Sequence, residues 1–109
     1  MTVAKLCQEC GFKAITLPDS ERAVSGAYIG DLLSWVMGRA TADCAWITIM
    51  SNVNVIAVAS LSDAACVILA EGVIPDREIT ALAEEKGINL ISSQLPTYET
   101  AVLLSKILK

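Results

Sequence analysis

The sequence contains no histidine, so it lacks the side chain that most often acts as a general base near neutral pH. Without histidine, the Ser-His and Cys-His pairs that activate a nucleophile cannot form within this chain. Two glycine-rich patterns that bind nucleotide phosphates, GxxxxGK[ST] and GxGxxG, are also missing. A phosphoryl-transfer enzyme needs such a phosphate cradle together with metal-binding carboxylates. We therefore expect a protein that is not an enzyme and that carries no cofactor.

Aromatic residues and positive charge are scarce: aromatic residues make up 5% of the chain, and the formal net charge is −4. Few aromatic rings leave little surface on which single-stranded bases can stack. An acidic protein also repels the phosphate backbone. We therefore expect no binding to nucleic acid.

Long apolar runs are missing as well. The longest, residues 53–70, is interrupted by Asn54, Ser60, Ser62 and Asp63, so it falls short of a membrane helix of roughly 18 apolar residues. The opening residues, MTVAKLCQEC, lack the basic region and apolar core of a signal peptide. These patterns predict a cytoplasmic protein that does not enter a membrane, with its four cysteines reduced.

What the chain does have is a regular alternation of helical and strand patterns over residues 1–109. Such alternation predicts a single α/β domain with a mainly parallel sheet of about five strands flanked by helices. No helix separates the first two strands, so a mixed sheet is the alternative. The predicted strands are residues 12–17, 23–29, 44–50, 64–70 and 88–93, and the predicted helices are residues 2–10, 31–39, 52–61, 75–87 and 97–108.

Residues 52–61 fit two patterns, because their β-branched residues favour a strand while their apolar positions repeat at helical spacing. Two parallel strands need a crossover of a dozen or so residues, so we predict a buried helix here. Polar residues mark the starts of other helices, and we predict Thr2, Asp31 and Thr97 as N-caps.

Cys7 and Cys10 form a CxxC pattern, which occurs in thiol redox centres and as half of a zinc site. A structural zinc ion needs four ligands, and the sequence offers neither a second CxxC nor a histidine. Val3 and Leu6 fall on the same helical face as both cysteines, so packing in the core is the favoured interpretation. We predict no metal site, and a redox or metal role for this pair is the less favoured alternative.

Candidate ligand-binding residues are small or polar and lie at predicted turns. They are Ser25, Gly26, Asp31, Ser51, Asn52 and Asn54. Residues 25–26 can present backbone N–H groups to an anion. Residues 51–54 follow a predicted strand, and parallel sheets bind ligands outside the carboxyl ends of their strands. Helix capping is the favoured explanation for Asp31, and it explains Ser51 or Asn52 as well as ligand contact does.

Residues 21–34, ERAVSGAYIGDLLS, resemble the signature of DRTGG domains: Asp-Arg-x-x-x-Gly-Gly, an aromatic or apolar residue, then Asp-Leu-Leu. The matching residues are Arg22, Gly26, Tyr28, Asp31, Leu32, Leu33 and Ser34. Glu21 replaces the usual Asp, and Ala27 replaces the second Gly. Residues 46–76 and 83–101 are similar to the middle and the end of the same family, so the likeness extends over nearly the whole chain.

This resemblance implies a fold like the N-terminal domain of HPr kinase/phosphorylase and a regulatory or dimer-forming role beside an enzyme. We accordingly expect a non-catalytic regulatory or scaffolding module that senses a small ligand or contacts a partner enzyme. The alternative is a sensor that binds a nucleotide or another small phosphorylated ligand. Ala27 argues against a phosphate cradle at this turn, because alanine lacks the conformational freedom of glycine.

The last predicted helix carries more apolar surface than one core contact covers. One stripe, Ala101, Leu104, Ser105 and Leu108, can pack on the sheet, and the surface is extended by Val102, Leu103 and Ile107. Surplus apolar surface marks an interface, and a two-fold dimer is the commonest way to cover it. We therefore predict a homodimer.

Overall fold

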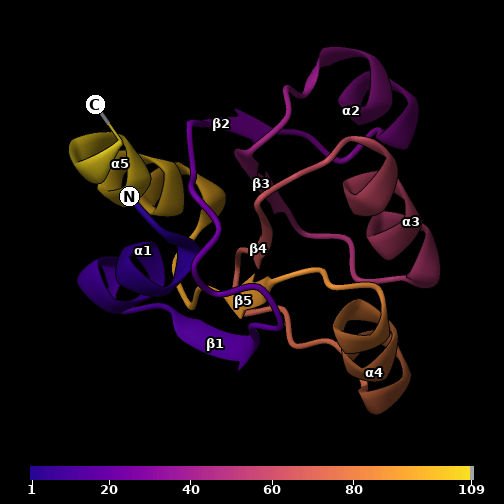
Figure 1. Ribbon diagram of the computed structural model, residues 1–109. Coiled ribbons are helices and arrows are strands. Elements are labelled where there is room, and N and C mark those ends of the chain that lie inside the picture. The colour runs from indigo at the N-terminus through magenta and orange to yellow at the C-terminus, as the bar shows by residue number, and fades with distance from the viewer. Residues whose placement is uncertain (109) are drawn as a thin grey trace.

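The computed structural model describes residues 1–108, which form five helices and five strands (Figure 1). In chain order these are α1 (Val3–Cys10), β1 (Lys13–Thr16), β2 (Gly26–Ile29), α2 (Leu33–Arg39), β3 (Cys44–Thr48), α3 (Val53–Leu61), β4 (Cys66–Leu69), α4 (Arg77–Glu85), β5 (Leu90–Ser92) and α5 (Thr97–Ile107). Each predicted strand and helix is present, and each strand is shorter than its predicted range.

The strands form one sheet in the order β1-β5-β4-β3-β2. Strands β2, β3, β4 and β5 are parallel, and β1 runs antiparallel to β5. The sheet is therefore mainly parallel and mixed, as the α/β pattern predicted. The two strands without a helix between them do not pair with each other, because they lie at opposite edges of the sheet.

The helices cover both faces of the sheet (Figure 1). Each crossover from β2 to β5 moves one strand along the sheet in the same direction, so right-handed connections put α2, α3 and α4 on one face. Helices α1 and α5 cover the other face. Two apolar clusters result, one around Trp46 and Ile56 beneath the three crossover helices, and one around Leu6, Ile47 and Leu104 beneath α1 and α5.

Helix starts follow the expected polar signals at two positions. The Thr2 hydroxyl accepts a hydrogen bond from the Lys5 N–H at the start of α1, so the predicted cap is confirmed. Residues 53–61 form the buried helix α3, whose first N–H groups donate to the Asn52 carbonyl oxygen Oδ1. The prediction of a helix, which rested on the need for a crossover between parallel strands, is therefore confirmed despite the β-branched residues of this segment.

Two predicted caps are wrong. Helix α2 begins after Leu32 and α5 after Pro96, and neither residue makes a side-chain capping bond. The Asp31 carboxylate is used elsewhere, because it accepts hydrogen bonds from the end of β3. Thr97 is itself the first residue of α5, and its N–H donates to the Glu71 carboxylate at 2.7 Å. A carboxylate from a distant loop thus does the work that the local sequence assigned to Thr97.

A buried asparagine that the sequence pattern did not single out joins three parts of the chain. Asn89 is 1% exposed and lies just before β5. Its Oδ1 accepts from the Asp19 N–H at 2.9 Å, and its Nδ2 donates to the Asp19 and Ala65 carbonyls at 2.8 and 2.9 Å. The side chain therefore ties the loop after β1 and the start of β4 to the start of β5.

We expect Asn89→Ala to lower the free energy of unfolding by about 2–4 kcal/mol, because the buried Ala65 carbonyl and two partly buried main-chain groups of Asp19 lose their partner. Denaturant melts monitored by tryptophan fluorescence provide the measurement. Asn54→Ala, at an exposed position, is the matched control and should change stability by less than about 0.5 kcal/mol. Equal stability of the two variants would show that water replaces the lost bonds.

Candidate functional site

Arg22, the arginine of the signature-like segment, lies at the amino ends of the parallel strands. Its Nε and Nη2 donate to Asp43 Oδ1 at 3.2 and 2.9 Å. Nη2 also donates to the Asp63 carboxylate and to the Asp63 main-chain carbonyl, both at 2.8 Å. One guanidinium therefore joins the turns that precede β3 and β4.

Both partner aspartates sit in left-handed turns, with φ angles of 65° at Asp43 and 56° at Asp63. Aspartate tolerates this conformation better than most residues, which explains why acidic side chains occur at these two turns. The turns are also joined directly, since the Asp43 N–H donates to the Asp63 carbonyl at 2.8 Å. The Ser25 N–H donates to the Asp43 carbonyl at 2.9 Å, which sets the start of β2 against β3.

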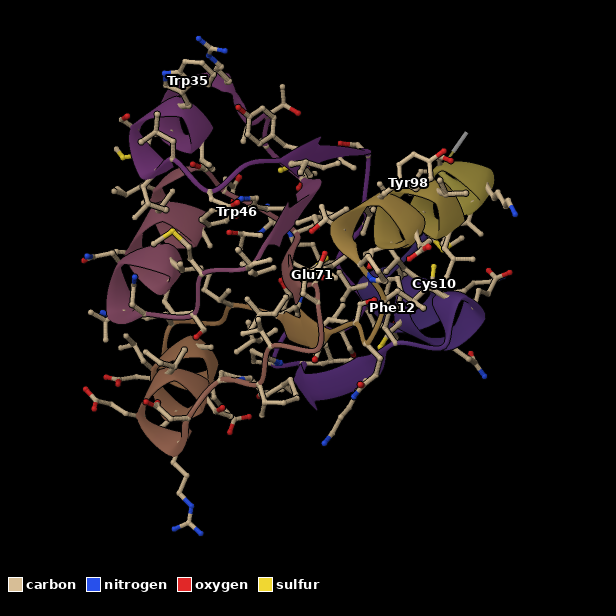
Figure 2. All side chains as sticks on the ribbon, turned by 180° about the vertical axis from the view of Figure 1, so that it is seen from behind. Cys10, Phe12, Trp35, Trp46, Glu71 and Tyr98 are labelled. Carbon is tan, nitrogen blue, oxygen red and sulfur yellow. The ribbon has the colours of Figure 1, made fainter. Side chains whose placement is uncertain are left out.

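At the other end of β2, Asp31 bonds to the end of β3. Its Oδ1 accepts from the Thr48 hydroxyl at 2.7 Å and from the Ile49 N–H at 3.1 Å. The Trp46 indole N–H donates to the Gly30 carbonyl at 2.9 Å, so a ring buried beneath α2 and α3 also holds this junction (Figure 2). A Cβ on Gly30 would approach the Tyr28 ring to 3.0 Å, so a larger residue here would require the ring to shift. Residues 21–34 thus fasten the edge strand β2 to β3 at both ends.

The six candidate ligand residues do not come together in one place. Ser25 and Gly26 lie at the amino end of β2, while Asp31 and residues 51–54 lie at the carboxyl end of the sheet. Gly26 is free of both constraints that favour glycine: the positive-φ glycines among residues 1–108 are at other positions, and an added Cβ would meet no atom within 4 Å. Gly26 therefore shows neither of the two features for which a phosphate-binding turn would need glycine.

Ser51 and Asn52 line a surface cavity of about 450 Å³ at the start of α3. Asp76 and Glu78, at the start of α4, line the same cavity. Asn52 caps α3, and Asp76 caps α4 by accepting the Ile79 N–H at 2.9 Å, so both helix starts already have an acceptor. The carboxylates of Asp76 and Glu78 would repel a phosphate group in this cavity. Nucleotide-binding α/β proteins bind their ligand in a crevice where successive strands begin to be added in the opposite direction along the sheet. Here the four parallel strands β2 to β5 follow one another in a single direction, so they have no such point.

Two further cavities are apolar and involve α5. The first, about 420 Å³, lies between the edge strand β2 and α5 and is lined by Gly26, Ala27, Tyr28, Ile29, Ile47, Ala101, Leu104, Ser105 and Leu108. The second, about 330 Å³, lies on the outside of α5 and is lined by Leu95, Tyr98, Glu99, Val102 and Leu103. Sequence reasoning missed the first cavity, because it arises only where α5 crosses the sheet.

The apolar surplus predicted on the last helix is present only in part. Val102 and Leu103 are half-buried and line the outer cavity beside Tyr98, which is 76% exposed (Figure 2). Ile107 instead packs against the core beneath α1 and α5. It was wrongly assigned to the surface because helical spacing alone cannot tell how far the neighbouring α1 extends over α5.

The comparisons with known proteins agree with this architecture. Residues 5–107 match the family described as the DRTGG domain. This chain belongs to the DRTGG domain family. The resemblance of residues 21–34 to the DRTGG signature is therefore confirmed, and it extends over almost all of the chain.

A solved structure similar to this DRTGG domain contains the CBS and DRTGG domains of the regulatory region of Clostridium perfringens pyrophosphatase, complexed with its activator diadenosine tetraphosphate. The TM-score is 0.72 at 13% sequence identity, and the match covers 94% of this chain and 48% of the other. This chain therefore spans about half the length of that regulatory region. No curated protein matches the chain by sequence.

The cysteines of this DRTGG domain are packed as small apolar groups. Cys7 is buried and its thiol donates to the Phe12 carbonyl at 3.2 Å, while Cys10 is half-buried at the end of α1 (Figure 2). Burial raises the pKa of both thiols, which disfavours the thiolate that redox chemistry and metal binding need. Within residues 1–108 no three His, Cys, Asp or Glu side chains are grouped to hold a metal ion. Of the helices in that range, none has the length and apolar character to cross a bilayer.

We expect Arg22→Met and Asp31→Ala each to lower the free energy of unfolding by about 1–3 kcal/mol. Both remove charge-assisted hydrogen bonds that fasten β2, and Asp31→Ala also leaves the buried Thr48 hydroxyl without its acceptor. Arg77→Met, at an exposed helix position, is the control and should stay within about 0.5 kcal/mol of the parent. Unchanged stability of both test variants would mean that these residues serve something other than the fold.

We expect the thiols of the folded protein to react slowly with a disulfide reagent at mildly alkaline pH. The raised pKa of Cys7 and Cys10 keeps both protonated there, and burial shields Cys44 and Cys66. In denaturant all four should react at the rate of a free thiol. Rapid reaction of two thiols in the folded state, lost in Cys10→Ser, would support the redox alternative.

Proposed function

We propose that this DRTGG domain is a non-catalytic regulatory module that acts through assembly, as a homodimer that contacts a partner enzyme. The observation that carries the proposal is the fold match over 94% of the chain to part of an enzyme's regulatory region. In that pyrophosphatase a DRTGG domain accompanies CBS domains in the region that is complexed with an activator.

The use of the polar side chains supports the same function. Arg22 and Asp31, the two charged residues that match the family signature, are occupied in fastening β2 to β3. A general acid or base must lie within hydrogen-bond reach of a bound substrate, and neither Arg22 nor Asp31 lines the cavities described above. The cavities that involve α5 are instead lined mainly by apolar side chains, which is typical of surfaces that contact protein.

A second candidate function is a sensor for a nucleotide or another small phosphorylated ligand. The observation that favours it is the cavity of about 450 Å³ at the start of α3, where Ser51 and Asn52 contribute side chains that can donate hydrogen bonds. Such a cavity falls within the size range of small-molecule sites. The carboxylates of Asp76 and Glu78 at the same cavity weigh against a phosphate and make this the less favoured function.

Thermal denaturation with ATP, AMP or diadenosine tetraphosphate separates the two functions. For assembly alone we expect no change in Tm at millimolar nucleotide. A sensor with nucleotide at 100 times Kd would gain about 2.7 kcal/mol, which in a domain of this size raises Tm by more than about 10 °C.

Two outcomes would contradict the favoured function. A rise in Tm with nucleotide that is lost in Ser51→Glu would establish the sensor, because the new carboxylate repels phosphate from the cavity. Asn54→Asp is the matched control, since Asn54 does not line that cavity. Release of phosphate from ATP that disappears in Asp31→Asn would show catalysis.

A further inference from the structure

The two edges of the sheet differ in how they are protected against pairing with another strand. Strand β1 carries Lys13, has a register shift between Ala14 and Thr16, and is joined to α4 by a hydrogen bond from the Thr16 hydroxyl to Glu84 at 3.0 Å. Charge, irregularity and a covering element are the usual means by which natural proteins block an edge. Strand β1 is therefore protected against pairing with a further strand.

Strand β2 shows none of these three features within the described chain. Residues 23–30, AVSGAYIG, contain no charge, and β2 pairs with β3 in an unbroken parallel register from Gly26 to Ile29. Among residues 1–108, strand β2 has β3 on one side and no strand on the other, so the N–H and C=O groups of that outer side have no partner strand. The side chains of Ala27 and Ile29 are exposed. A regular, uncharged, exposed edge is a template for a further strand.

We propose that the β2 edge is the homodimer interface, and that β2 of one copy pairs antiparallel with β2 of a second copy. The proposal rests on the homodimer proposed above and assigns its surface. A two-fold axis through the pair makes the contact antiparallel, because each copy must present the same strand in the reverse direction. The two five-stranded sheets then continue as one sheet across the interface.

Charge favours a second copy as the occupant of this edge. The chain carries a net charge of −4, so two copies repel each other wherever their charged surfaces meet. Residues 23–30 have no charge that would face its own equivalent across the axis. At the β1 edge, by contrast, self-pairing would bring two Lys13 side chains into the same contact.

Side-chain sizes along β2 also suit self-pairing. Tyr28 packs toward the core beneath α2, α3 and α4, so the alternation of a strand puts Ala27 and Ile29 on the α5 face. With the two-fold axis perpendicular to the sheet, the α5 faces of both copies lie on the same side of the joined sheet. Side chains on that face therefore lie opposite side chains on the same face of the second copy. In a register centred on Tyr28, Ile29 lies opposite Ala27 of the second copy, a large side chain beside a small one.

The surroundings of β2 supply the rest of an interface. The cavity of about 420 Å³ between β2 and α5 lies on the face where Ile29 of a second copy would arrive. On the other face, Leu32 and Trp35 are more than half exposed just beyond the carboxyl end of β2, and Arg39 stacks on the Trp35 ring at 3.7 Å (Figure 2). A stable interface buries about 800 Å² per partner, so the contact must extend beyond the strand to these flanking side chains. Tryptophan and arginine are the residue types that most often dominate binding energy.

Variants that introduce a charge at Ile29 test the proposal. The measurement is light scattering coupled to size exclusion at roughly 100 μM protein, far above the Kd of a stable dimer. The parent should elute with about twice the mass of one 11.5 kDa chain. Ile29→Lys and Ile29→Glu should each be monomeric, because like charges then lie diagonally across the strand pair, about 7–8 Å apart. An equimolar mixture of the two variants should recover the dimer, which a misfolded variant cannot do.

Two controls separate this interface from other surfaces. Ile74→Lys is the matched control, because Ile74 is 53% exposed against 50% for Ile29 and lies in the loop before α4. It should remain dimeric, as should Tyr98→Lys on the outer face of α5. A dimer that survives both Ile29 variants but is lost in Tyr98→Lys would overturn the β2 interface and leave the proposed homodimer intact. A monomeric parent would overturn both.

Discussion

The hydrogen-bond network around Arg22 sets the relative positions at which three of the parallel strands begin. Its guanidinium reaches two turns, at Asp43 and Asp63, that lie 20 residues apart in the chain and precede neighbouring strands. The carboxylates are about half exposed or more, so as ion pairs they contribute at most about 1 kcal/mol each. The larger contribution is geometric, because the bond to the Asp63 main-chain carbonyl holds a left-handed turn in place. Strands β2, β3 and β4 therefore start at fixed heights relative to each other.

The bonds of Arg22 help to explain what residues 21–34, the segment that resembles the DRTGG signature, do in the fold. Arg22 acts at the amino end of β2 and Asp31 at its carboxyl end, so both charged residues fasten an edge strand that has only one neighbour. At Gly30 the chain passes close to the Tyr28 ring, which a Cβ there would approach to 3.0 Å. Gly26 and Ala27 meet no such constraint, which is why alanine at position 27 is compatible with the fold.

A strand fastened at both ends and uncharged between them is well suited to binding another strand. Its rigidity lowers the entropy lost on pairing, since the backbone is already ordered. The cavity beside α5 and the exposed side chains near Trp35 lie along the same edge. The polar cavity at the start of α3 has the opposite character, with helix caps already formed and two carboxylates facing a prospective anion. This distribution of polar and apolar groups is the reason for proposing assembly rather than ligand sensing.

The sequence by itself determined the α/β class and the order of helices and strands, because hydrophobic periodicity is a local property and parallel strands need crossovers. The family followed instead from the resemblance of residues 21–34 and two later segments to the DRTGG domain. The sequence also decided the capping of α1 by Thr2, which requires only neighbouring residues. The tertiary structure alone decided the partners of Asp31, Thr97 and Asn89, since each bonds to a group from a distant segment. It likewise decided that Ser25 and Gly26 lie at the opposite end of the sheet from Asp31 and residues 51–54, because strand direction separates positions that are close in sequence. The placement of β1 at one edge and β2 at the other followed from pairings that no local pattern encodes.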